Sequence, residues 1–209
     1  MPHTHSQSQF DRLLNKMNRS VSCVVFISML VVMTIWYTWT RILDTPSNRR
    51  RVSGEVRALV KQAKKTPKDL RIASDLFRRS QSKYDFEAVN ALVGLGDIGD
   101  TASSKVSDIA TLMRSTNATI RRESARTLAK LGHRSEPVMN DLALQVAKYP
   151  SDDASWFAAV ALGRIGAKAE KYLPLLRDRI GTGASQFDDS LRQAIASIEE
   201  SLKDEAIAR

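Results

Sequence analysis

The chain has 209 residues, of which 43% are apolar, and its formal net charge is +9. A single cysteine, Cys23, excludes an internal disulfide framework, and the apolar fraction is that of a chain able to bury a core. Most of the positive charge lies in residues 41–80, where twelve Lys/Arg accompany four Asp/Glu, while residues 81–209 are nearly neutral. The basic character therefore belongs to one segment of the chain.

An uncharged segment follows the polar tail of residues 1–20. It reads "VSCVVFISMLVVMTIWYTWT" from Val21 to Thr40, and a helix of about 20 residues spans about 30 Å, the thickness of the bilayer hydrocarbon. Amphipathic aromatic side chains favour the headgroup boundary. We therefore predict a single transmembrane anchor over residues 21–43, with three aromatic residues as its interface anchors: Trp36, Tyr37 and Trp39.

Two other interpretations of this segment compete with the anchor. A cleaved signal peptide has a shorter apolar stretch and small residues before the cut, and a buried soluble helix does not carry β-branched residues on every face. The orientation follows from the flanking charges, because cationic flanks tend to stay in the cytoplasm. More of them follow the segment than precede it, which favours a single-pass membrane protein whose repeats lie on the cytoplasmic side.

Residues 44–80 form a basic juxtamembrane segment. A turn-rich linker at Asp44–Asn48 precedes helical periodicity that breaks at Thr66-Pro67. Thr66 suits an N-cap and Pro67 the first residue of a second helix. We expect a helical hairpin that packs on the start of the repeats as a cap.

The basic cluster Arg49, Arg50 and Arg51 has two interpretations. Cationic residues beside a membrane attract anionic lipid, so the cluster predicts a lipid-facing surface. A topology signal with a solvated face is the plainer alternative. Nucleic-acid binding is not expected, because the segment lacks interleaved aromatic residues and the repeats supply no basic groove.

One pattern recurs between residues 81 and 207 with a period of 33–34 residues. Each unit begins with a helix whose apolar residues stand three and four apart. Each of these helices ends at a glycine, which we expect in a left-handed conformation: Gly99, Gly132 and Gly166. A second amphipathic helix is expected within a few residues. Its equivalent positions are Val106, Met139 and Leu173, then Ile109, Leu142 and Leu176, then Met113, Val146 and Ile180.

A single helical pair of this kind cannot bury its apolar face, so neighbouring pairs must stack. The sequence therefore predicts an all-α fold, an α-solenoid of helical hairpins over residues 81–207 after the N-terminal transmembrane helix. The last helix combines an acidic outer face with an apolar stripe, as a C-terminal cap requires: Leu191, Ile195, Ile198 and Leu202.

The segments "STNATIRRESARTLAKLG" and "PSDDASWFAAVALGRIG" resemble HEAT repeats of the short type also found in phycobilin lyases. Ile120-Arg121 matches the hydrophobic-Arg step of that pattern, whereas Ala154-Ser155 and Glu87-Ala88 depart from it. The resemblance covers about residues 81–205. It implies a protein-binding scaffold whose second helices line a concave surface; some such arrays are chromophore lyases and others DNA glycosylases, and the fold alone does not choose.

Nothing in the sequence predicts catalysis, a metal or a cofactor. The histidines stand in the polar tail and in one inter-helix turn, and the acidic pairs before first helices suit helix capping. Four residues are candidates for binding a partner: Arg121, Arg122, Trp156 and Tyr172. Arg121 could instead pair with a carboxylate of the neighbouring unit, Trp156 could fill the gap between units, and Tyr149 and Tyr172 suit either interpretation.

We therefore expect a membrane-anchored, non-catalytic scaffold that binds a protein partner, with the anchor raising the local concentration of that partner. The alternative is a lyase-like enzyme or enzyme accessory that handles a chromophore or small ligand on the same solenoid. It would need a pocket with convergent polar groups, which the sequence does not reveal.

Overall fold

The computed structural model describes residues 28–35 and 45–208, and every regular element in them is helical. The chain divides into two compact units, residues 1–49 and 50–209. In the first unit, residues 28–35 form a helix. No helix among the described residues has the length and apolarity needed to cross a bilayer. Most of the predicted span 21–43, including its interface anchors Trp36, Tyr37 and Trp39, lies outside the described residues and stays a prediction.

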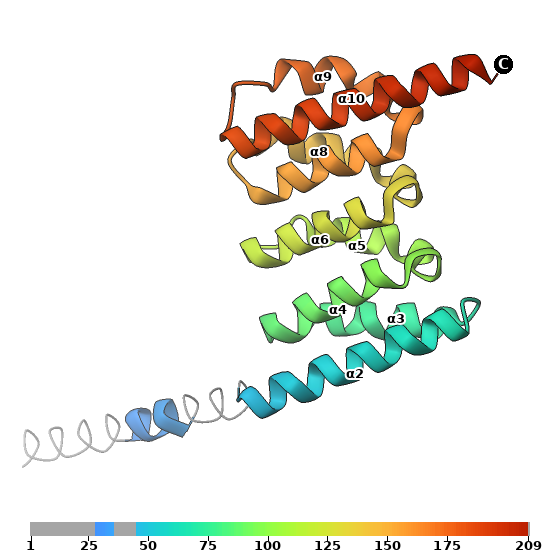
Figure 1. Cartoon of the computed structure of the whole chain (residues 1–209). Helices are drawn as coiled ribbons and strands as arrows, with labels where there is room; N and C mark the ends of the chain where they lie inside the picture. The colour runs from blue at the N-terminus through green and yellow to red at the C-terminus, as the bar shows by residue number, and fades with distance from the viewer. Residues whose placement is uncertain (1–27, 36–44, 209) are drawn as a thin grey trace, which may run out of the picture. The chain divides into compact units, whose positions relative to one another are not determined.

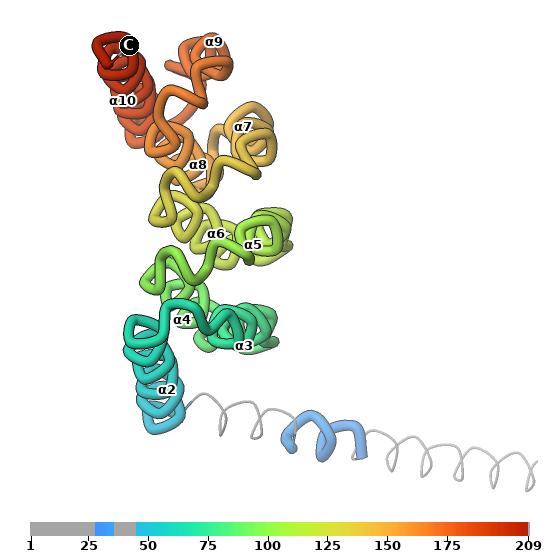
Figure 2. Tube along the Cα trace, turned by 90° about the vertical axis from the view of Figure 1, so that its right-hand side faces the viewer, coloured from blue at the N-terminus to red at the C-terminus, as the bar shows by residue number. Residues whose placement is uncertain are grey.

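The α-helices are α2 (Pro46–Lys65), α3 (Leu70–Ser80), α4 (Asp85–Asp97), α5 (Val106–Leu112), α6 (Ala118–Leu131), α7 (Met139–Lys148), α8 (Asp153–Ile165), α9 (Leu173–Asp178) and α10 (Ser185–Ile207). Short 3-10 helices precede three of them: η1 (Gly99–Lys105), η2 (Gly132–Val138) and η3 (Gly166–Tyr172). In the second unit, helices with even numbers form one layer and helices with odd numbers the other (Figures 1 and 2). This all-helical arrangement is consistent with the predicted α-solenoid class.

The joint between first and second helices depends on glycine. Gly132 has φ 59° and ψ −125°, and Gly166 has φ 79° and ψ −145°. The positive φ confirms the prediction, but the extended ψ differs from the left-handed helical value and places both residues in a region that is essentially restricted to glycine. A seven-residue 3-10 helix, which the sequence did not predict, begins at each glycine. The second helices α7 and α9 then start at Met139 and Leu173, the first of the equivalent positions predicted for them.

The predicted apolar stripes form one continuous core. Leu95, Leu128 and Leu162 are fully buried at equivalent positions of α4, α6 and α8. The equivalent positions of the second helices, Ile109, Leu142 and Leu176, are buried as well. On the terminal helix α10 the fully buried stripe consists of Phe187, Leu191, Ala194 and Ile198, while Ile195 and Leu202 are partly buried. Packing of equivalent residues thus joins each pair to the next.

Polar bonds between successive helical pairs of the repeat array recur with the period of the sequence. Asp97 pairs with Lys130, Asp100 with Arg134, and Glu136 with Lys168. The partners lie 32–34 residues apart, so each bond joins one unit to the equivalent place in the next. In Asp100, the hydrogen bond from Arg134 lowers the pKa of the carboxyl below its ordinary value.

The hairpin α2–α3 departs from the sequence prediction at both helix starts. Helix α2 begins at Pro46, inside the predicted linker, because proline at a first helical position lacks only a donor that would have no partner. Thr66 does not cap α3, and Pro67 lies in the turn before it. Asp69 is the N-cap, and its side chain accepts a hydrogen bond from the backbone N–H of Arg71. The N-cap of α3 is therefore Asp69, and the prediction of Thr66 for this role was wrong.

The hairpin packs on α4, as the sequence predicted, and one cation ties the three helices together. Arg79 of α3 lies 2.9 Å from Glu55 of α2, 3.3 Å from Asp75 of α3 and 3.6 Å from Glu87 of α4. Its side chain is only 20% exposed. The hydrogen bond from Arg79 lowers the pKa of Glu55. Burial opposes ionisation of Asp75, but the hydrogen bond from Arg78 and the charge of Arg79 outweigh it and lower that pKa too.

We expect this cluster to make stability dependent on acid pH. A carboxyl group whose pKa is lowered by folding contributes its full stabilisation at pH values above its pKa in the unfolded chain, which is about 4. That contribution is lost as the pH falls through the lower pKa of the group in the folded chain. An Arg79→Met variant should be less stable by about 1 kcal/mol at neutral pH, and the gap from the native chain should narrow toward pH about 3. Denaturant unfolding at both pH values measures this gap; Arg192→Met, at an exposed arginine 3.7 Å from Asp189 and outside the cluster, is the control. A gap that does not depend on pH would contradict the assignment.

Candidate protein-interaction surface

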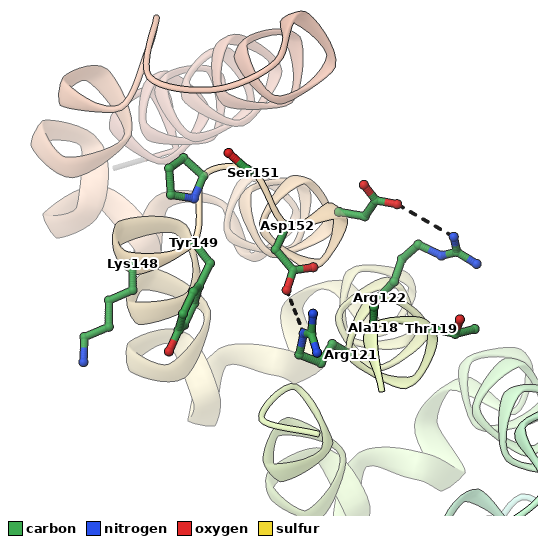
Figure 3. Close-up of a pocket in the computed structure, with 10 residues that line it drawn as sticks. Ala118, Thr119, Arg121, Arg122, Lys148, Tyr149, Ser151 and Asp152 are labelled. Carbon is green, nitrogen blue, oxygen red and sulfur yellow. Dashed lines mark hydrogen bonds and ion pairs between the residues drawn. The ribbon is translucent and has the colours of Figure 1, made fainter. Parts of the chain in front are cut away.

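A hollow of about 560 Å³ opens where α6 and α8 begin and α7 ends. Two of the predicted partner-binding residues, Arg121 and Arg122, line it (Figure 3). The other lining residues are Ala118, Thr119, Lys148, Tyr149, Pro150, Ser151, Asp152 and Asp153. The hollow therefore combines cations, hydroxyl groups and one aromatic ring at the ends of three helices.

The turn that carries Tyr149 is fixed by local chemistry. Tyr149 precedes a proline, which disfavours the helical conformation, and α7 ends at Lys148. The Asp152 N–H donates to the Tyr149 carbonyl at 2.9 Å, which closes a turn with Pro150 at its second position. The buried Ser155 hydroxyl donates to the same carbonyl at 2.6 Å. Two hydrogen bonds to the Tyr149 carbonyl thus fix the backbone that carries the tyrosine side chain.

Arg121 is engaged within the fold. Its Nε donates to Asp152 of the next unit at 2.7 Å, and its Nη1 donates to the carbonyls of Ser115 and Thr116 at 2.9 and 3.1 Å. The ion pair with a neighbouring unit is the second of the two roles that the sequence allowed. Asp152 also accepts from the Ala154 N–H and so caps α8. Arg121 therefore connects the loop before α6 to the start of α8.

Arg122 is the more available of the two arginines. Its side chain is 41% exposed, against 25% for Arg121. Its contacts are longer, 3.3 Å to Glu123 and 3.7 Å to Asp153. Figure 3 shows the two guanidinium groups on separate sides of the start of α6. Arg122 can therefore turn toward a partner without breaking a short bond.

A second, smaller hollow of about 220 Å³ adjoins the first on α5 and α7. Lys148 and Tyr149 line both hollows, and Leu144 and Arg114 line the smaller one. Tyr149 is 54% and Leu144 42% exposed. We call the surface formed by Leu144, Lys148, Tyr149 and the two hollows the α7 surface. It brings two exposed apolar side chains next to cationic groups.

The remaining predicted residues lie away from these hollows. Trp156 is partly buried against the core, and its buried indole N–H has no acceptor among the described residues. Tyr172 is also partly buried, and its hydroxyl hydrogen-bonds to Asn140 of the preceding unit. The sequence prediction missed Leu144 as a surface residue. Its signal was its place on α7, two residues from each of the buried Leu142 and Val146 and so off the apolar stripe.

Another hollow of about 360 Å³ opens on the layer of α4, α6 and α8. Arg126, Lys130 and Arg164 contribute its positive charge and Glu123 its negative charge, and each takes part in bonds within the fold. Arg126 lies over the Phe157 ring and pairs with Glu123, Lys130 pairs with Asp97, and Arg164 donates to the Ala129 carbonyl. Arg126, which is 61% exposed, is the cation of this hollow that compares with Arg122 of the α7 surface.

The chemistry of the α7 surface suits recognition. Its three carboxylates, Asp141, Asp152 and Asp153, each face an arginine, and Asp152 also caps a helix. Among the described residues no group of three His, Cys, Asp or Glu is placed to hold a metal ion. Hydroxyl groups, an aromatic ring and partly free cations are the groups that bind polar and aromatic side chains of a partner.

Neither a protein-family model nor a curated protein matches the chain. The resemblance to HEAT repeats consequently rests on the repeated sequence pattern alone. Function must be inferred from the surfaces of this fold, since the fold class alone does not select one.

Proposed function

We propose that the chain is a non-catalytic scaffold, anchored in a membrane by residues 21–43, which binds a protein partner through the α7 surface of a HEAT-like α-solenoid. The repeated sequence pattern and the two-layer helical stack support the solenoid. Stacked repeats of this kind present extended, rigid surfaces. A rigid surface loses little conformational freedom when it binds, which favours affinity.

The observation that carries the proposal is the exposure of Tyr149 on a fixed turn between two hollows. Tyrosine and arginine are enriched among the residues that dominate binding energies, and such residues act at the centre of well-packed contacts. Tyr149 and Leu144 supply apolar area, while Arg122 and Lys148 supply charge at its edge. This composition matches the apolar centre and polar rim of protein interfaces.

The anchor is supported by the part of it that the structure describes. Within residues 28–35, six apolar side chains are exposed, each by about half or more: Met29, Leu30, Val31, Val32, Met33 and Ile35. In a bilayer, lipid chains would bury these apolar side chains, and no other protein element would be needed to cover them. The flanking cations favour the cytoplasmic side for the repeats. An anchored scaffold raises the effective concentration of a partner at the membrane.

The lyase-like alternative draws support only from the volume of the larger hollow, which lies within the range of small-ligand pockets. Such pockets enclose most of their ligand, whereas this hollow opens to solvent where three helices end. Of its carboxylates, Asp152 is engaged by Arg121 and by the cap of α8. A docking role accounts for the exposed Leu144 and Tyr149 as well, which a ligand pocket does not.

We expect Tyr149→Ala to weaken partner binding about 30-fold, because truncation of a central tyrosine typically costs about 2 kcal/mol. The partner is purified with the full chain from native membranes, identified by mass spectrometry and then titrated against each variant. Leu70→Ala is the matched control, since Leu70 is equally exposed but lies on α3. Equal binding by both variants would refute the α7 surface as the docking site, and a co-purified pigment or metabolite would favour the lyase-like alternative.

A further inference from the structure

Cations on α2 differ from those elsewhere in the stack in how they are neutralised. Of the eight Lys/Arg between Arg50 and Arg71, only Arg51 forms an ion pair, with Glu55 at 2.8 Å. Of the eighteen between residues 72 and 208, twelve form ion pairs. Within the described residues, free positive charge is therefore concentrated at the first helix of the stack and the turn after it.

Four cations of α2 that form no ion pair share one face of the helix, and one of them, Arg57, donates to the Ser53 carbonyl at 3.1 Å. Arg50, Arg57, Lys61 and Lys64 are spaced by seven, four and three residues, which places them on a single line along a helix. All four side chains are exposed. The line extends about 21 Å at 1.5 Å per residue. We call these four residues the α2 stripe; Lys65, Lys68 and Arg71 continue the charge into the turn and α3.

The α2 stripe has no internal compensation. Like charges three and four residues apart on a helix repel each other, and the nearest carboxylate on α2, Glu55, already accepts from Arg51 and Arg79. Between the first two of these cations, a methyl group added at Gly54 would meet nothing within 4 Å. A surface of negative charge can therefore approach this part of the stripe.

We infer that the α2 stripe binds the anionic headgroups of a lipid bilayer, as a second attachment beside the anchor. This inference rests on the proposed membrane location. The predicted anchor ends at residue 43, so that Arg50 lies at most about 25 Å from it along the chain, well within reach of the headgroup layer. The stripe carries no aromatic residue on which a nucleic-acid base could stack. The lipid-facing cluster predicted at residues 49–51 thus extends along α2, while Arg51 itself is engaged.

The test uses the full chain reconstituted into vesicles of neutral phosphatidylcholine or of phosphatidylcholine with phosphatidylserine. Acetylation of each lysine with a water-soluble reagent is followed over time by mass spectrometry. We expect Lys61 and Lys64 to react at least about threefold more slowly in the anionic vesicles. The difference should disappear at high salt, since screening weakens electrostatic attachment. Lys148, Lys171 and Lys203, which are exposed and form no ion pair, should react equally in both.

Two matched triple variants separate the stripe from net charge. Arg57→Gln/Lys61→Gln/Lys64→Gln should abolish the protection of Lys65 and Lys68 by anionic lipid. Lys148→Gln/Lys171→Gln/Lys203→Gln removes the same charge and should preserve that protection. Both sets lie on exposed positions, so circular dichroism should report unchanged helical content for each. Loss of protection in both variants would overturn the assignment to α2.

The outcomes distinguish the stripe from the anchor. Release of the chain from neutral vesicles by an alkaline wash would refute the transmembrane anchor, while the acetylation of vesicle-bound chain still reports on the stripe. Equal acetylation rates in neutral and anionic vesicles would refute the lipid assignment. Stronger protection by duplex DNA or RNA, added to detergent-solubilised chain, would also overturn it and assign the stripe to nucleic acid.

Discussion

Replacing Gly163 with alanine should lower the free energy of unfolding by about 2 kcal/mol. A Cβ at this position would lie 2.7 Å from the Cα of Ala194, a backbone atom of α10 that cannot rotate away. Forcing α8 and α10 apart costs about 3 kcal/mol, and alanine regains about 1 kcal/mol through its higher helix propensity. Thermal unfolding followed by circular dichroism should show a melting temperature lower by about 4–8 °C for a chain of this length.

The same substitution at Gly96 is the matched control, because Gly96 holds the equivalent position on α4, two helical pairs earlier. Its added Cβ would meet the Lys130 side chain, at 3.0 Å, which is half-exposed and able to move. Gly96→Ala should therefore change stability by less than about 1 kcal/mol. Gly54→Ala, in open space on α2, should stabilise the fold by about 0.5–1 kcal/mol. If Gly163→Ala behaved like these two, the close approach of α8 and α10 would be wrong.

The repeat period allowed the core to be predicted from the sequence. Apolar residues recur at fixed distances from each glycine, and a stripe of this kind has only one stable place, between neighbouring helices. Ile109, Leu142 and Leu176, named by that pattern, are all buried. The signal is strong because each position is read several times over, once in every unit. The all-helical fold followed from the same regularity.

Helix starts were harder to predict, because neighbouring residues compete for the cap. Thr66, followed by a proline, looks like a helix start, yet Asp69 three residues later supplies a better acceptor for the free N–H groups. The 3-10 helices were missed for a related reason. Their bonds differ from those of an α-helix by one residue in span, and the apolar period hardly records that change. These features depend on local energy differences that are small compared with core burial.

The candidate site could be predicted only in part, because its residues meet through the fold. Arg121 was predicted either to bind a partner or to pair with a neighbouring carboxylate, and its acceptors come from the loop before α6 and from the next helical pair. Tyr149 left both outcomes open, since a tyrosine after an apolar stripe can turn inward or outward. The position of Pro150 and the Ser155 hydroxyl decide the path of the turn. Residues that the fold brings together in this way are not regularly spaced along the chain, so a sequence pattern cannot reveal them.

The inter-unit bonds show why local changes should have local effects. The ion pairs Asp97–Lys130 and Glu136–Lys168 each connect one helical pair only to the next pair along the chain. The buried leucines of the core likewise pack between neighbouring helical pairs. Stability of a stacked array is therefore approximately a sum over neighbours. A substitution at one joint weakens that joint most, and hydrogen exchange in the adjacent helices reports it more directly than a global melting curve.

Arg121→Met should destabilise the joint between α6 and α8 by about 2–3 kcal/mol, because hydrogen bonds to charged groups each contribute about 1.5–3 kcal/mol. Methionine keeps the apolar stem but leaves Asp152 and the Ser115 and Thr116 carbonyls without their donor. Arg121→Lys should restore little, since a single ammonium cannot reproduce the planar fork. Faster amide exchange at the start of α8 is the expected readout.

Arg122→Met is the matched control for this prediction, one residue along the same helix. Its contacts are longer and its side chain is 41% exposed, so removal should cost less than about 1 kcal/mol. The two variants should also separate by function: Arg121→Met weakens the fold, whereas Arg122→Met weakens partner binding on the α7 surface while the fold is retained. A double-mutant cycle with Asp152→Asn isolates the Arg121 ion pair. If Arg122→Met proved as destabilising as Arg121→Met, the division of roles between these adjacent arginines would be incorrect.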